Sequence, residues 1–176
     1  MMPKARWLNY LAIYTIALVI CTAFSSLKGK GFTDLGLLTQ EKVTTQWAYY
    51  QAKAIKSYIY QMQYDRVIIS LEALPTNTPA THRELYLAKI AEYEKNIKRY
   101  DLEKKYIQRE AQQLEKKRDE ALERSYPFNT AVVFLQVAIV CAIIAALLDR
   151  RVVWYISLPV GLIGLLYFLN GFFLFY

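Results

Sequence analysis

The sequence predicts an all-α integral membrane protein with three transmembrane helices and an extramembrane, antiparallel helical hairpin of coiled-coil-like character. The first observation is three apolar runs, at residues 7–24, 128–148 and 152–176, that contain no Asp, Glu, Lys, Arg or His. A helix rises about 1.5 Å per residue, so about 18 uncharged residues cross a hydrocarbon core of about 30 Å. The second observation is a charged stretch between the first two runs, in which apolar residues recur at helical spacing. The lipid bilayer is therefore the first predicted partner.

Residues 1–24 are predicted to form a short N-terminal tip and the first transmembrane helix. Lys4 and Arg6 precede the apolar run. Because the run is longer than the roughly 7–15 apolar residues of a cleavable signal peptide, we expect a retained anchor. Residues 25–37 hold three of the six glycines, so we expect a loop there.

Residues 38–126 are predicted to form the hairpin, with helices at about 38–73 and 81–125. The first helix is indicated by residues at i, i+4 and i+7 spacing, namely Val43, Trp47, Tyr50, Ala54 and Tyr58. Pro75 and Pro79 disfavour helix at the residues before them, which predicts the turn. A helix that is apolar over so much of its circumference needs cover on more than one side.

A seven-residue repeat marks the second hairpin helix. Its start is predicted at Thr81, because Thr81 and Glu84 have the spacing of a capping box. The repeat comprises Tyr86, Tyr93, Tyr100, Ile107, Leu114 and Ala121, with Ile97 at a companion position. This spacing is typical of helices that pack along a seam.

Residues 127–148 and 152–176 are predicted to be the second and third transmembrane helices. Gln136 lies near the middle of the second span, where its amide either hydrogen-bonds a neighbouring helix or lines a pore. Asn170 is a further intramembrane polar residue, in the third span.

The charge pattern argues against a nucleic-acid partner. The net charge is +7, but 18 basic residues interleave with 14 acidic ones between Lys28 and Arg124. A nucleic-acid binder gathers its basic residues into a patch, whereas interleaved charges are typical of a solvated helix surface.

The sequence predicts no catalytic, metal or cofactor site, and therefore no enzyme. His82 is the only histidine and lies beside a turn, where we expect a surface residue. No His, Cys and carboxylate set has metal-ligand spacing. Cys21 and Cys141 both lie inside apolar runs and are interpreted as small buried hydrophobic residues.

Residues on both hairpin helices are predicted to pack against a partner or a second copy. Trp47 has two interpretations, which are compatible: it packs between the hairpin helices, or it anchors a docking surface. The full predicted set is Trp47, Tyr50, Gln51, Ala54, Tyr58, Tyr86, Tyr93, Ile97, Tyr100, Ile107 and Leu114.

Basic residues near the spans favour one orientation. Lys4, Arg6, Arg150 and Arg151 share one side of the predicted spans, and short segments rich in Lys and Arg favour the cytoplasm. We therefore expect a cytoplasmic N-terminus and a hairpin on the opposite side of the membrane. In the inner (cytoplasmic) membrane of a Gram-negative bacterium, this side is the periplasm.

Three strings resemble a known family. They are QWAYYQAKAIK at residues 46–56, EKKRDEA at residues 115–121 and FLQVAI at residues 134–139. They resemble the bacterial membrane-protein family of domain of unknown function 4337. The resemblance extends over nearly the whole chain and implies one N-terminal span, a charged helical middle and two C-terminal spans. It implies no established activity.

The sequence therefore predicts a non-enzymatic structural or accessory protein of the membrane. It would assemble through its hairpin into a homo-oligomer or a larger membrane complex. The alternative is an oligomeric channel or pore lined by the second transmembrane helix.

Overall fold

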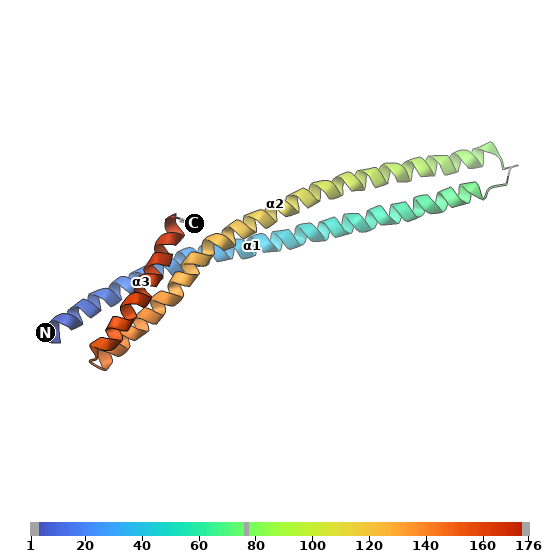
Figure 1. The fold of residues 1–176 in the computed structure, drawn as a ribbon. Helices are drawn as coiled ribbons and strands as arrows, with labels where there is room; N and C mark the ends of the chain where they lie inside the picture. Colours follow the sequence, from blue (N-terminus) through green and yellow to red (C-terminus); the bar gives the residue numbers. More distant parts are fainter. Residues whose placement is uncertain (1–3, 76–77, 174–176) are drawn as a thin grey trace. The chain divides into compact units, whose positions relative to one another are not determined.

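The computed structural model describes residues 4–75 and 78–173. It contains three helices: α1 (Lys4–Glu72), α2 (Ala80–Leu147) and α3 (Arg151–Phe173) (Figure 1). All regular structure within the described residues is helical, which confirms the all-α class. Each helix contains a segment long and apolar enough to cross a membrane. The first residues of the predicted tip, 1–3, and the end of the predicted third span, 174–176, lie outside the described residues.

The loop predicted at residues 25–37 is wrong, because α1 continues as a helix through all of them. Gly29 and Gly36 are seven residues apart, and both are buried against α2. A Cβ atom at Gly36 would lie 2.6 Å from Leu122 Cδ2, and one at Gly29 would collide with the side chain of Asn129. These glycines permit close helix packing, which offsets their helix penalty of about 1 kcal/mol each.

Pro75 and Pro79 lie in the break between the two long helices. α1 ends at Glu72, and α2 begins at Ala80, one residue before the expected start. α2 then continues through Pro127, so the charged helix and the second apolar run are parts of one helix.

The chain divides into two compact units. Unit 1 comprises residues 1–38 and 117–176, and unit 2 comprises residues 39–116. Unit 1 therefore contains the three apolar runs, and unit 2 contains most of the charged stretch.

Small side chains allow the helices of unit 1 to approach closely. Leu18 of α1 packs in a buried cluster with Ala131, Leu135 and Ala138 of α2. On α3, a Cβ atom at Gly164 would lie 2.8 Å from Leu135 Cγ. Such small-residue contacts are typical of helices that associate within a membrane, where burial of apolar surface supplies no driving force.

A tight turn joins α2 to α3. The backbone N–H of Arg150 donates to the carbonyl of Ala145 at 3.2 Å, and that of Asp149 donates to the carbonyl of Ala146 at 3.4 Å. This is the Schellman pattern of a helix C-terminus. Asp149 has a φ of 52°, a left-handed conformation that Asp and Asn tolerate better than other non-glycine residues.

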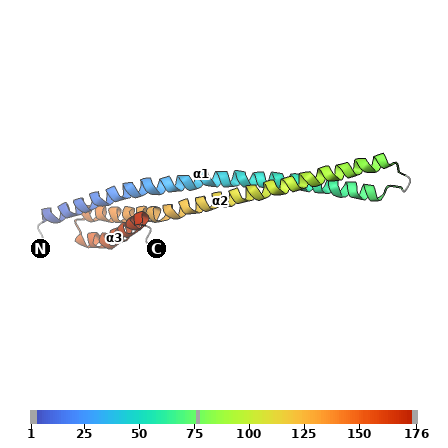
Figure 2. The same ribbon diagram turned by 90° about the horizontal axis from the view of Figure 1, so that it is seen from above.

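Unit 2 has a thin apolar core. Its segments of α1 and α2 lie side by side in the two views (Figure 1 and Figure 2). Among the described residues of this unit, the buried apolar side chains are Val43, Tyr100 and Ala111. Other contacts must therefore hold the two helices together.

Candidate interaction surfaces

Polar side chains join α1 to α2 inside unit 2. Trp47 Nε1 donates a hydrogen bond to Glu115 Oε1 at 2.9 Å. Ser57 Oγ donates to Asp101 Oδ1 at 3.1 Å. Residue numbers rise on one helix as they fall on the other, so the two contacts show that these segments run in opposite directions.

An aromatic cluster and an ion pair add to these contacts. Tyr60 of α1 stacks on Tyr100 of α2 with ring centroids 5.6 Å apart, and its ring centroid lies 5.9 Å from that of Tyr93. Lys53 forms an ion pair with Glu103. The hydrogen bond from the Lys53 ammonium group holds the pKa of Glu103 below its ordinary value, so this carboxylate stays charged at neutral pH.

Asp101 is a second carboxylate held in its charged form. Lys104 Nζ lies 2.8 Å from Asp101 Oδ1. The hydrogen bond from Lys104 is the main cause of a lowered pKa at Asp101, and the hydroxyl of Ser57 lowers it further. Partial burial acts in the opposite direction but is outweighed.

The residues predicted to pack fall into three groups by exposure. Tyr100 is buried, and most of the others are half-buried: Trp47, Tyr50, Ala54, Tyr86, Tyr93, Ile97, Ile107 and Leu114. Gln51 and Tyr58 are exposed. The ring contacts of Tyr93 and Tyr100 with Tyr60 lie within the chain, as does the hydrogen bond of Trp47. The role of this set toward a partner stays a prediction.

Sequence reasoning missed several residues of the internal contact. Ser57 lies seven residues after Tyr50 and fourteen after Val43, so its heptad position was visible in the sequence. The spacing of four residues from Ala54 led instead to its neighbour Tyr58, which is exposed. Tyr60 was missed because its role depends on the rings that α2 brings to it.

An unpartnered apolar stripe lies on the opposite side of α1. We define the outer α1 stripe as Ala48, Ala52, Ile55, Ile59, Met62 and Ile69, all of which are exposed. The first five follow one another at spacings of four and three residues, and Ile69 lies seven residues further on. Successive residues turn by about 100° around a helix, so Ile59 points away from Ser57, which faces α2.

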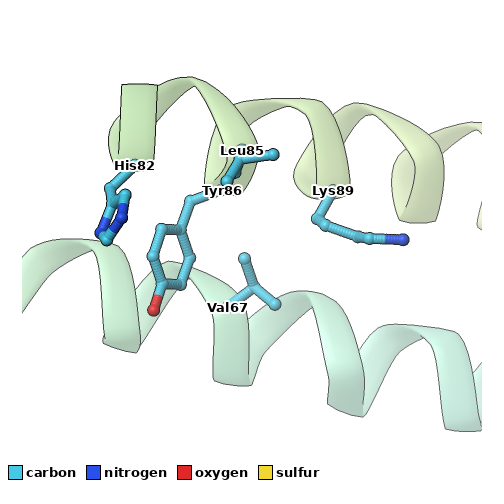
Figure 3. Close-up of a pocket in the computed structure, with 5 residues that line it drawn as sticks. All are labelled: Val67, His82, Leu85, Tyr86 and Lys89. Atoms are coloured by element: carbon cyan, nitrogen blue, oxygen red, sulfur yellow. The ribbon is translucent and has the colours of Figure 1, made fainter. Parts of the chain in front are cut away.

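A pocket of about 360 Å³ lies between α1 and α2 in unit 2 (Figure 3). Its lining residues are Val67, His82, Leu85, Tyr86 and Lys89. Figure 3 shows the ring of Tyr86 extending from α2 toward Val67 on α1. Lys89 Nζ lies 2.8 Å from a Glu92 oxygen, and this hydrogen bond raises the pKa of Lys89.

The pocket offers no set of groups for catalysis. Its walls are mostly apolar, and His82 is exposed at its edge. In the part of the chain that the structure describes, no group of three His, Cys, Asp or Glu side chains is placed to hold a metal ion.

The polar residues within the apolar runs of unit 1 have different surroundings. Tyr14 donates its hydroxyl to the carbonyl of Ser157 at 2.9 Å, which joins α1 to α3. Gln136, predicted as an intramembrane polar residue, is exposed on α2. Asn170 is half-buried, and its Oδ1 is buried without a hydrogen-bond partner among the described residues.

Comparison with known proteins assigns the chain to a family. No curated protein and no solved structure matches it. A family model described as "Domain of unknown function (DUF4337)" matches residues 7–174. This confirms the resemblance of the three strings, and because the match extends over nearly the whole sequence, the chain belongs to the DUF4337 family.

Proposed function

We propose that the protein is a non-enzymatic structural or accessory component of the bacterial inner membrane that assembles with further copies of itself. In this proposal, unit 2 is an extramembrane, coiled-coil-like hairpin that carries the assembly surface. The outer α1 stripe is the observation that supports it most directly.

The stripe leaves large apolar side chains in water. The exposed fractions are 59% for Ile55, 46% for Ile59, 70% for Met62 and 66% for Ile69. Burying one such side chain fully stabilises by about 1.5–3 kcal/mol. Covering these four residues on each of two copies thus contributes on the order of 10 kcal/mol. Association costs about 4–15 kcal/mol, and anchoring both copies in one bilayer reduces that cost.

A second copy fits the stripe because of its spacing. Spacings of three and four residues are those by which one helix packs along another. Every copy carries the same uncovered stripe, so a two-fold contact would cover both stripes at once. Trp47 would then act indirectly, by holding α1 and α2 together behind the surface.

The orientation belongs to the same proposal. Lys4, Arg6, Arg150 and Arg151 support a cytoplasmic N-terminus, which places unit 2 in the periplasm. A larger membrane complex containing other proteins is a second possible form of the assembly.

Detergent-corrected mass measurement by light scattering tests the proposal. Ile59→Glu forces a carboxylate into the stripe, so it is expected to shift the oligomer toward the monomer. Leu102→Glu is the matched control, because Leu102 is similarly exposed but lies on α2, outside the stripe. A monomeric native protein, or equal masses for native protein and Ile59→Glu, would contradict the proposal. Stoichiometric co-purification of another protein would point to the larger complex.

One observation favours the channel as a second candidate. Gln136 exposes an amide between the exposed apolar residues Val133 and Val140 on α2. An amide facing lipid is unfavourable, so the side chain calls for a polar partner, either on another helix or in a water-filled pore. Purified protein in planar bilayers should then conduct ions, and Gln136→Leu should change the conductance. A native protein without conductance would exclude the channel.

A further inference from the structure

A pocket of unit 1 is lined by two cationic side chains, which form no ion pair with a described carboxylate, and by three phenylalanine rings. The pocket has a volume of about 180 Å³ and is lined by Lys28, Phe32, Arg124, Phe128, Gly171 and Phe172. These residues come from all three helices. None of them belongs to the outer α1 stripe.

The position of the pocket along the chain corresponds to the edge of the apolar runs. Lys28 is the first charged residue after the first run, and Arg124 is the last charged residue before the second. Each lies four residues from the nearest end of its run, which is about 6 Å along a helix. The headgroup layer on each side of a bilayer is about 5–7 Å thick. The ammonium group of Lys28 and the guanidinium group of Arg124 therefore lie at the depth of the lipid headgroups.

Within the described residues, some lysines of the chain are paired with carboxylates, but the two cations of the pocket are not. In unit 2, Lys53 and Lys98 form ion pairs with carboxylates. Lys28 and Arg124 form no ion pair with any described carboxylate, and both are exposed. Their charges are thus available to an anion from outside the chain.

Aromatic rings close the apolar side of the pocket. Phe128 is 2% exposed, and its ring lies 6.2 Å from that of Phe32 and 5.3 Å from that of Phe172. A Cβ atom at Gly171 would lie 2.8 Å from the Phe128 ring, so α3 approaches α2 closely at this point. The site therefore has a charged opening beside a packed apolar wall.

We propose that this pocket binds the phosphate group of an anionic phospholipid. Lys28 and Arg124 would donate hydrogen bonds to the phosphodiester oxygens, while the acyl chains run beside the phenylalanine rings into the bilayer. Basic pockets between transmembrane helices bind anionic headgroups in this way at the cytoplasmic or matrix surface of membranes, and we extend the same chemistry to this pocket. The inference is independent of the proposed assembly.

Native mass spectrometry of the full chain, released from a neutral detergent, tests the lipid site. The probes are phosphatidylglycerol, phosphatidylcholine and inorganic phosphate. Phosphatidylglycerol should be retained more strongly than phosphatidylcholine. Lys28→Gln and Arg124→Gln should each weaken its retention about fivefold, and the double variant about thirtyfold. Lys30→Gln is the matched control, since Lys30 is an exposed lysine two residues away that does not line the pocket.

Each other outcome overturns the proposal. An equal loss with Lys30→Gln would show that retention depends on overall surface charge. Equal retention of phosphatidylcholine would show that the headgroup charge is irrelevant. Displacement of phosphatidylglycerol by inorganic phosphate at the same concentration would show a site for free anions.

Discussion

Trp47 on α1 and Glu115 on α2 are joined by a hydrogen bond of 2.9 Å between the indole Nε1 and a carboxylate oxygen. The contact spans 68 positions of the sequence and lies at one end of a series of polar contacts in unit 2. The series compensates for a core with few apolar side chains. Charged and hydrogen-bonding groups therefore contribute to the stability of this unit beside its apolar and aromatic contacts.

Removing the indole donor should destabilise unit 2. Trp47→Phe keeps an aromatic ring beside Tyr50 but leaves Glu115 without this hydrogen bond, so we expect a loss of about 1 kcal/mol in unfolding free energy. Circular dichroism during thermal unfolding measures it. Glu115→Gln keeps an acceptor oxygen and should lose less. An unchanged unfolding midpoint for Trp47→Phe would show that the bond contributes nothing to stability.

Unit 2 should lose stability in acid. Asp101 and Glu103 have lowered pKa values in the folded chain, mainly through hydrogen bonds from Lys104 and Lys53. The stabilisation is present above the pKa of the unfolded carboxyls, near pH 4, and is lost as the pH falls through the lower folded values. Thermal unfolding midpoints, measured at a series of pH values from neutral to pH 2, should fall once the pH is below about 4. The double variant Asp101→Asn, Glu103→Gln should flatten this drop, and an equally steep drop would assign it to other groups.

Two glycines should respond in opposite directions to the same substitution. Gly164→Ala places a Cβ atom 3.0 Å from the backbone nitrogen of Leu135, which cannot move aside easily, so we expect a loss of about 1–3 kcal/mol. Gly31→Ala meets nothing within 4 Å and should stabilise α1 by up to about 1 kcal/mol. Thermal unfolding in detergent compares the two variants. Equal effects would contradict the close approach of α3 to α2.

The turn between α2 and α3 should tolerate Asn but reject β-branched residues. Asp149→Val forces a branched side chain into a left-handed conformation, which costs about 1–2 kcal/mol. Asp149→Asn should lose less stability than Asp149→Val, because Asn adopts this backbone conformation more readily than a β-branched residue does. The same unfolding measurement separates them. A stable Val variant would mean that the turn has another backbone conformation.

The sequence pattern predicted the membrane-crossing segments better than residues 25–37, which follow the first of them. The apolar runs and the proline-bounded turn identified the three membrane-crossing segments and the break between α1 and α2, because length and charge constrain a membrane-crossing helix strongly, but α1 was predicted as two helices. The glycines at positions 29, 31 and 36 suggested a loop instead of a helix. Gly29 and Gly36 share one heptad position with Val43 and Ser57, which was the available signal for a continuous helix. Only the proximity of α2 explains why glycine is needed there.

The candidate surfaces were predicted less well for a different reason. An apolar residue at helical spacing has the same appearance in sequence whether it faces a helix of its own chain or a partner. Trp47 and Tyr100 therefore stood in one set with Tyr58, although the first two have partners inside the chain and Tyr58 is largely exposed. The pocket at Lys28 and Arg124 joins residues about a hundred positions apart, which no local pattern reveals.

The polar interface of unit 2 also affects which segments of the chain are inserted into the membrane during synthesis. The insertion machinery selects segments by hydrophobicity, and a charged residue at the centre of a helix opposes insertion by about 2.5–3.5 kcal/mol. Lys53 and Glu103 lie on the surfaces that α1 and α2 turn toward each other. Because charged residues take part in this pairing, the two segments of unit 2 can recognise each other without either being inserted as an additional span.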